Sequence, residues 1–134
     1  MIEIVALDHV VLRTSRMDDM LHFYSTVLGC PVERELSPEF GLVQLRAGSA
    51  LIDLVAVDSE LGRVGGGPPT AGGNNMDHFC LQIEPQPEDA IRQYLVSQGI
   101  EAGQFERRYG AQGFGNSLYL RDPEGNVVEL RNRL

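Results

Sequence analysis

The first half of the chain has the hydrophobic pattern of one strand, one helix and three further strands. Residues 4–13 are rich in Val, Ile and Leu, and apolar residues then recur at helical spacing from Met17 to Leu28. Ser15, with an acidic residue three positions later, resembles a capping box, and Gly29 stands where a helix C-terminus favours glycine. The remaining strands are expected at 32–36, 41–47 and 50–57.

The second half repeats this order of elements. His9 and His78 are 69 residues apart, and Gly29 and Gly99, which each follow a helix, are 70 apart. The repeat predicts an α+β fold of two βαβββ modules, residues 1–57 and 76–134, in a single domain with a flexible glycine-rich connector, 58–75, between them. The expected elements of the second module are a strand at 76–83, a helix at 87–98 and strands at 102–108, 117–121 and 126–131.

Composition narrows the class of protein. The chain has 134 residues, 43% of them hydrophobic, which is enough for a packed core, and its formal net charge is -8. This charge disfavours nucleic acid and anionic membrane surfaces as partners. No run approaches a membrane span and no signal pattern begins the chain, so a cytoplasmic location with reduced Cys30 and Cys80 is expected.

Each module also carries a histidine and a carboxylate at matching strand positions, His9 with Asp53 and His78 with Glu129. Because side chains alternate along a strand, each pair faces away from the apolar side that meets the helix. A curved, half-barrel-like mixed sheet with the helices on its outer face would gather all four residues on the concave side. Two imidazoles and two carboxylates suit a divalent ion such as Ni, Co, Zn, Mn or Fe, and a released carboxylate could move a proton.

Each of these residues has a plainer alternative. A single strand histidine such as His9 is often only a hydrogen-bonded residue of the core or rim. Asp53 interrupts an apolar run, and a salt bridge to Arg13 or Arg46 would satisfy it as well as a metal would. Glu129 follows a turn near the C-terminus and could be a solvated edge residue.

Four segments carry a family resemblance that covers essentially the whole chain. They are Asp-His-Val-Val at 8–11, the helix segment 22–29, Asp-His at 77–78, and Arg-Asp-Pro-Glu-Gly-Asn-Val-Val-Glu-Leu at 121–130. Together they resemble the vicinal oxygen chelate superfamily, which includes glyoxalase I, methylmalonyl-CoA epimerase, extradiol dioxygenases, fosfomycin-resistance transferases and bleomycin-resistance proteins. The fold is thereby implied, whereas the reaction differs between members.

The resemblance implies metal coordination by His9, Asp53, His78 and Glu129, with Glu129 and Asp53 exchanging protons with substrate. Asp53 falls where glyoxalase I places its additional carboxylate, which favours a metal-dependent lyase or isomerase of the lactoylglutathione-lyase type acting beside a metal-chelating carbonyl. The alternatives are an epimerase, an Fe(II) extradiol-type dioxygenase, and a metal-free drug-sequestering protein like the bleomycin-resistance members.

Further parts of the site follow from the same resemblance. Arg13 matches an arginine that binds a carboxylate of glutathione, although a surface charge is the alternative. Tyr109 and Phe114, in a glycine-rich segment, are expected to cover a small-molecule substrate, with a plain hairpin loop as the alternative. Val57 stands in place of a glutathione-holding asparagine, so a glutathione hemithioacetal is one candidate substrate only. Family members often pair as homodimers that complete the site between chains.

Overall fold

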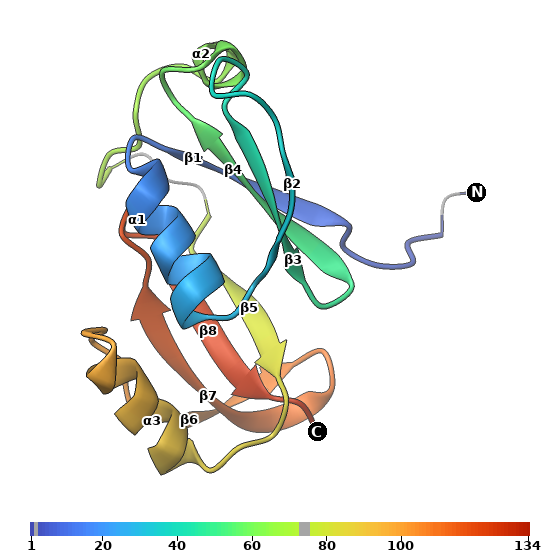
Figure 1. The fold of residues 1–134 in the computed structure, drawn as a ribbon. Helices are drawn as coiled ribbons and strands as arrows, with labels where there is room; N and C mark the ends of the chain where they lie inside the picture. The colour runs from blue at the N-terminus through green and yellow to red at the C-terminus, as the bar shows by residue number, and fades with distance from the viewer. Residues whose placement is uncertain (2, 73–75) are drawn as a thin grey trace. The chain divides into compact units, whose positions relative to one another are not determined.

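The computed structural model describes residue 1 and residues 3–72 and 76–134, which form two compact units, Met1–Pro69 and Thr70–Leu134. Each unit contains a four-stranded mixed sheet and helices in the order strand, helix, three strands (Figure 1). The predicted α+β class and the repeated βαβββ order are therefore confirmed. The boundary between the units falls within the predicted connector.

The first unit builds its sheet in the order β1-β4-β3-β2, with β1 parallel to β4 and the other neighbours antiparallel. Helix α1 contacts β4, and the π-helical segment η1 continues it directly. The elements of this unit are β1 (His9–Thr14), α1 (Met17–Leu21), η1 (His22–Val27), β2 (Val32–Glu35), β3 (Leu42–Ala47), β4 (Ala50–Ala56) and α2 (Glu60–Val64).

The core of this unit forms because one side of the helix and one face of the sheet are apolar. Strand residues that alternate with the polar positions are almost fully buried, and so are the apolar residues of α1 and η1. Burial of each such side chain stabilises the fold by about 1.5–3 kcal/mol. The main members of this core are Leu12, Met20, Phe23, Tyr24, Val27, Val43, Leu45, Ile52 and Leu54.

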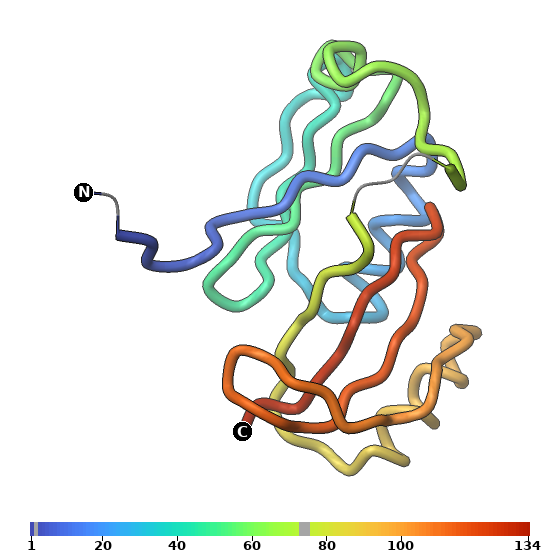
Figure 2. The backbone as a smooth tube through the Cα atoms, turned by 180° about the vertical axis from the view of Figure 1, so that it is seen from behind, coloured from blue at the N-terminus to red at the C-terminus, as the bar shows by residue number. Residues whose placement is uncertain are grey.

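The second unit repeats this arrangement with the sheet order β5-β8-β7-β6 (Figure 2). Here β5 is parallel to β8, and Ile91 and Leu95 of the helix are buried. The turn before β8 is built by Asp122, whose backbone oxygen accepts from Gly125 N at 2.9 Å, as the Asp-Pro-Glu-Gly sequence suggests. The elements are β5 (His78–Ile83), α3 (Glu88–Ser97), β6 (Glu106–Gly110), β7 (Gly113–Arg121) and β8 (Val127–Asn132).

Two local expectations were wrong, and a third was confirmed. The first strand begins at His9 rather than residue 4, and residues 3–8 precede it without strand structure, although Asp8 O still accepts from Leu51 N at 3.0 Å. The N-cap of α1 is Arg16 and not Ser15, because the first helical hydrogen bond runs from Met20 N to Arg16 O at 3.0 Å. Gly29 has a φ of +78°, as expected after a helix.

The connector and the glycine-rich segment of the second unit are more regular than expected. Residues 60–64 form α2, whose N-cap Ser59 accepts from Gly62 N at 3.1 Å, while residues 73–75 lie outside the described residues. Residues 106–121 form the β6–β7 hairpin, and the substrate-covering role of its rings stays a prediction. None of the described helices has both the length and the apolar character that crossing a membrane requires.

Candidate functional site

In the first unit, Asp53 lies in the middle of an inner strand, β4, on the face turned away from the helix. Its register partner on β1 is Val11, so His9, two residues earlier on β1, shares this face. The neighbouring residues Ile52 and Leu54 point into the core instead. Strand alternation thus places the first predicted histidine and carboxylate on one face of one sheet.

Asp53 is only 4% exposed, and its two carboxylate oxygens differ in their surroundings. Oδ2 accepts a hydrogen bond from Gln44 Nε2 at 3.1 Å, whereas Oδ1 is buried and has no hydrogen-bond partner among the described residues. The salt-bridge alternative is wrong, because Arg46 pairs with Glu33 at 2.7 Å and Arg13 donates to backbone carbonyls. A buried carboxylate oxygen without a partner costs free energy unless a cation or a proton neutralises it.

The imidazole of His9 is about half exposed, and its Nδ1 lies 2.6 Å from Asp8 Oδ1. This hydrogen bond is the main cause that raises the pKa of His9, and the charge of Asp53 raises it further. An imidazole whose Nδ1 is held by a carboxylate has its Nε2 available as a metal ligand.

The second unit holds its pair in direct contact. Glu129 is 6% exposed on the inner strand β8, so the solvated-edge alternative is wrong. Its Oε2 lies 3.1 Å from Nε2 of His78, whose Nδ1 lies 2.6 Å from Asp77 Oδ2. Tyr119, the β7 register partner of Glu129, meets the His78 ring edge-on with 5.2 Å between ring centroids.

Cys80, the β5 partner of Glu129, also lies on this face. Although Cys80 as a whole is exposed, partial desolvation of its thiol by the surrounding sheet is the main cause that raises its pKa to about 11, and the charge of Glu129 adds to the effect. A thiol with so high a pKa is almost entirely protonated at neutral pH and is therefore a poor nucleophile.

Sequence reasoning missed the carboxylates that hold the two imidazoles. Asp8 precedes His9 and Asp77 precedes His78. In each pair a carboxylate oxygen lies within hydrogen-bond distance of the Nδ1 of the following histidine. The available signal was the repeated Asp-His dipeptide, which indicated only the internal repeat and the family resemblance. A carboxylate in this position fixes the ring and raises the basicity of the other nitrogen.

The three predicted substrate-binding residues lie at different places. Arg13 shares the face of His9, but its Nη2 donates to Gly66 O at 2.6 Å and Gly67 O at 2.7 Å. Tyr109 and Phe114 pair across the β6–β7 hairpin with ring centroids 5.1 Å apart. Strand alternation places these rings on the opposite face of the sheet from the Glu129 carboxylate, and their substrate role stays a prediction.

A further arginine on the Glu129 face is buried against glycines. Arg131 is 2% exposed, and its Nη2 donates to Gly113 O at 3.0 Å. A Cβ at Gly110 or Gly115 would overlap the guanidinium of Arg131. The two glycines are therefore needed to admit this side chain.

The donor sets of the two units are chemically suited to a divalent first-row metal. Each unit contributes one imidazole and one buried carboxylate on one face, and the unpartnered Asp53 Oδ1 is an open donor. Within the described residues, no group of three or more His, Cys, Asp or Glu side chains is gathered closely enough to hold a metal ion. The pairs are thus present in each unit, and their combination is a proposal.

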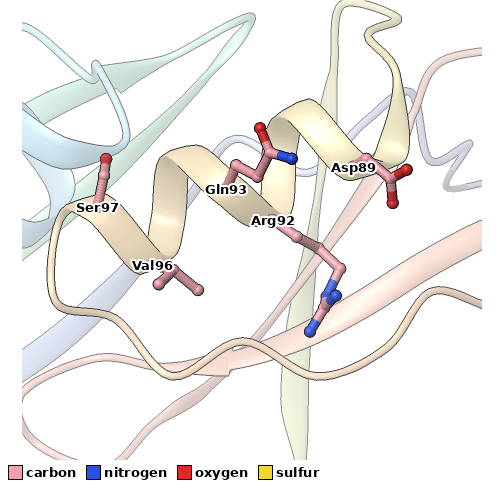
Figure 3. A pocket seen from close by; sticks show the side chains of 5 residues that line it. All are labelled: Asp89, Arg92, Gln93, Val96 and Ser97. Atoms are coloured by element: carbon pink, nitrogen blue, oxygen red, sulfur yellow. The ribbon is translucent and has the colours of Figure 1, made fainter.

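A surface pocket lies along α3 of the second unit. All of its lining side chains come from α3, and none is a predicted ligand (Figure 3). The lining residues are Asp89, Arg92, Gln93, Val96 and Ser97.

Three known proteins illustrate what the chain resembles. A virulence protein of Salmonella typhimurium is 29% identical over 125 residues, covering 92% of this chain and 81% of that protein, and its crystal structure superposes with a TM-score of 0.74. Biphenyl-2,3-diol 1,2-dioxygenase 2 of Rhodococcus globerulus is 34% identical over 132 residues, covering 92% of this chain but only 60% of the dioxygenase. Lactoylglutathione lyase of Agrobacterium tumefaciens, at 23% identity, a TM-score of 0.70, and coverage of 97% of this chain and 95% of the lyase, shares the fold.

A family model also matches most of the chain. Residues 6–130 match the family described as the Glyoxalase/Bleomycin resistance protein/Dioxygenase superfamily, and this span includes both histidines and both buried carboxylates. The superfamily contains enzymes of several reaction types as well as proteins that only bind a ligand. The chain therefore belongs to the Glyoxalase/Bleomycin resistance protein/Dioxygenase superfamily.

Proposed function

We propose that this protein is a metal-dependent lyase or isomerase that abstracts a proton next to a metal-chelating carbonyl. The observation that carries the proposal is the buried Asp53 carboxylate, which has an unpartnered Oδ1 and lies on the same face as His9. A structural role alone would leave no reason for a buried acid without a cation beside it. Members of the family catalyse several classes of reaction, and the residues of this site favour this one.

Four side chains would hold the divalent cation: His9 and Asp53 from the first unit, and His78 and Glu129 from the second. A bound cation of this kind polarises a carbonyl oxygen and stabilises negative charge developing on it. Glu129 and Asp53 would take the proton from carbon and return it, because both carboxylates are buried where water competes poorly. Asp8 and Asp77 would keep the two imidazoles in their ligating orientation.

The substrate is proposed to be a small oxygenated molecule that chelates the metal, with a glutathione hemithioacetal as the leading case. Arg13 would meet a carboxylate of such a substrate once its present carbonyl partners release it. A hemithioacetal formed from methylglyoxal and glutathione is the first compound to test.

A ring-cleaving dioxygenase is the second candidate, favoured by the 34% identity to the biphenyl-diol enzyme. His9, His78 and Glu129 would then form the two-His, one-carboxylate set typical of non-haem Fe(II) enzymes. In that case Asp53 would be dispensable for catalysis, whereas the lyase needs it. The Asp53→Asn variant therefore separates the two candidates.

The decisive experiment combines metal analysis with activity. Protein purified without chelator is expected to retain about one divalent ion per pair of units, and the reconstituted enzyme to convert the hemithioacetal but not catechol. His78→Ala should lose both metal and activity, whereas His22→Ala, which removes an exposed histidine of η1, should keep both. Wild-type protein that takes up no metal would instead support the drug-sequestering class.

The assembly is proposed to be a homodimer in which each site takes one unit from each chain. Mixing inactive His9→Ala chains with inactive His78→Ala chains would then restore one intact site per heterodimer. Recovery of about a quarter of the wild-type activity per site is expected for random mixing. No recovery from a demonstrably mixed dimer would place both units of a site in one chain.

A further inference from the structure

A row of polar side chains crosses the first sheet beside His9. Arg34 on β2 is in register with Gln44 on β3, and Gln44 is in register with Asp53 on β4. Arg34 Nη1 donates to Gln44 Oε1 at 3.1 Å, and Gln44 Nε2 donates to Asp53 Oδ2 at 3.1 Å. The row therefore runs from a surface cation through an amide to a buried carboxylate.

The chemistry of the two ends sets the orientation of the Gln44 amide. A guanidinium can only donate, so the amide oxygen must face Arg34, and a carboxylate accepts, so the amide nitrogen must face Asp53. The hydrogen bond between Gln44 and Asp53 is partly buried and therefore shielded from water, whereas the one between Arg34 and Gln44 is exposed. Amide flipping would break both bonds at once, so the row has one stable arrangement.

This arrangement makes the two oxygens of Asp53 unequal. Oδ2 is tied sideways along the sheet by Gln44, and Oδ1 is left buried without a partner. A carboxylate with one oxygen fixed has lost the freedom to exchange its oxygens or to rotate away. The second unit lacks this device, because Tyr119 occupies the matching position and Glu129 contacts His78 directly.

We propose that Gln44 is a positioning residue that holds Asp53 by Oδ2 so that Oδ1 serves as the metal ligand, with Arg34 acting through Gln44. The inference rests on the proposed function, because it assigns a task within the same site. It also accounts for the aspartate in the first unit, because its short side chain needs a hydrogen bond from a neighbouring strand to direct one oxygen toward a metal.

The test compares metal affinity and coordination in wild type, Gln44→Leu, Arg34→Leu and the double variant. Gln44→Leu is expected to weaken Co²⁺ binding by about 10- to 100-fold and to change the visible absorption spectrum of the bound Co²⁺. Gln82→Leu, which removes an exposed strand glutamine of the second sheet, is the matched control and should leave affinity and spectrum unchanged.

The double variant separates positioning from a general loss of structure. If Arg34 acts through Gln44, Arg34→Leu weakens Co²⁺ binding in the wild-type background but adds nothing in the Gln44→Leu background. Additive losses, or a Gln44→Leu protein that binds Co²⁺ with wild-type affinity and spectrum, would overturn the inference alone. Wild-type protein that binds no Co²⁺ would overturn the proposed function and the inference together, so the two failures are distinguishable.

Discussion

Replacement of Asp53 by asparagine is expected to stabilise the metal-free protein while weakening its binding of metal. Asp53 is 4% exposed, and its Oδ1 has no partner, which is a cost that the fold carries in the absence of a cation. Asparagine keeps the shape and its oxygen can still accept from Gln44, which puts a neutral NH2 group, in place of a charged oxygen, at the buried position without a partner among the described residues. We expect a net gain of about 1 kcal/mol, since removing the charge outweighs the weaker neutral hydrogen bond.

Addition of metal should reverse this order of stability. A free metal concentration of about 100 times the wild-type Kd stabilises the wild type by about 2.7 kcal/mol. If Asp53→Asn weakens affinity by about 100-fold, the same concentration stabilises the variant by only about 0.4 kcal/mol. The wild type then exceeds the variant by about 1.3 kcal/mol, combining these figures with the metal-free difference.

Urea unfolding followed by circular dichroism, with EDTA and then with Co²⁺ or Zn²⁺, measures both differences. The raised pKa of His9 contributes stability that is fully present below its unfolded value of about 6.5 and is lost as pH rises through the folded value. Measurements at about pH 8.5 therefore keep this contribution out of the comparison. In the variant, the pKa of His9 should also fall, because the charge of Asp53 raises it. A variant that is less stable than wild type in EDTA would refute the reasoning, because Asp53 would then be a stabilising acceptor.

Three other predictions test local contacts: a glycine beside a buried arginine, a helix N-cap and a cysteine thiol. Gly110→Ala should cost about 1–3 kcal/mol in urea unfolding because its Cβ overlaps the guanidinium of Arg131, whereas Gly67→Ala, where the space is open, should stay within about 0.5 kcal/mol. Ser59→Ala removes the buried N-cap of α2 and should cost about 1 kcal/mol, and an unchanged unfolding midpoint would argue against the cap. Cys80 is exposed but has a pKa of about 11, so it should react slowly with iodoacetamide at pH 8 and faster toward pH 11, as peptide mass spectrometry would show; rapid labelling at pH 8 would contradict the raised pKa.

The elements could be predicted because periodicity is a local property. Alternation along the strands also placed Asp53 and Glu129 on the histidine faces, since a side-chain period of two needs no knowledge of the partner strand. The start of β1 could not be predicted in this way. Ile4 and Val5 are as apolar as the strand, yet β4 begins at Ala50 and has no residues left to pair with them.

The residues that hold the candidate ligands in place could not be predicted from the sequence. Gln44 meets Asp53 only because β3 and β4 pair in one register, and a shift by one residue would turn Gln44 into the core. No spacing in the sequence reveals that register. Helix α2 could not be predicted for another reason. Gly62 and Gly65 lower the helix propensity of this segment, while the N-cap at Ser59 stabilises the helix.

The strands that carry the candidate ligands differ in how firmly each sheet holds them. Asp53 and Glu129 stand on inner strands, paired on both sides, whereas His9 and His78 stand on strands paired on one side within their own sheets. Backbone amides of β4 and β8 should accordingly exchange with deuterium more slowly than those of β1 and β5. Each half of the site would then combine an anchored acid with a more mobile imidazole, so that adjustment to ions of different radius falls to the histidines.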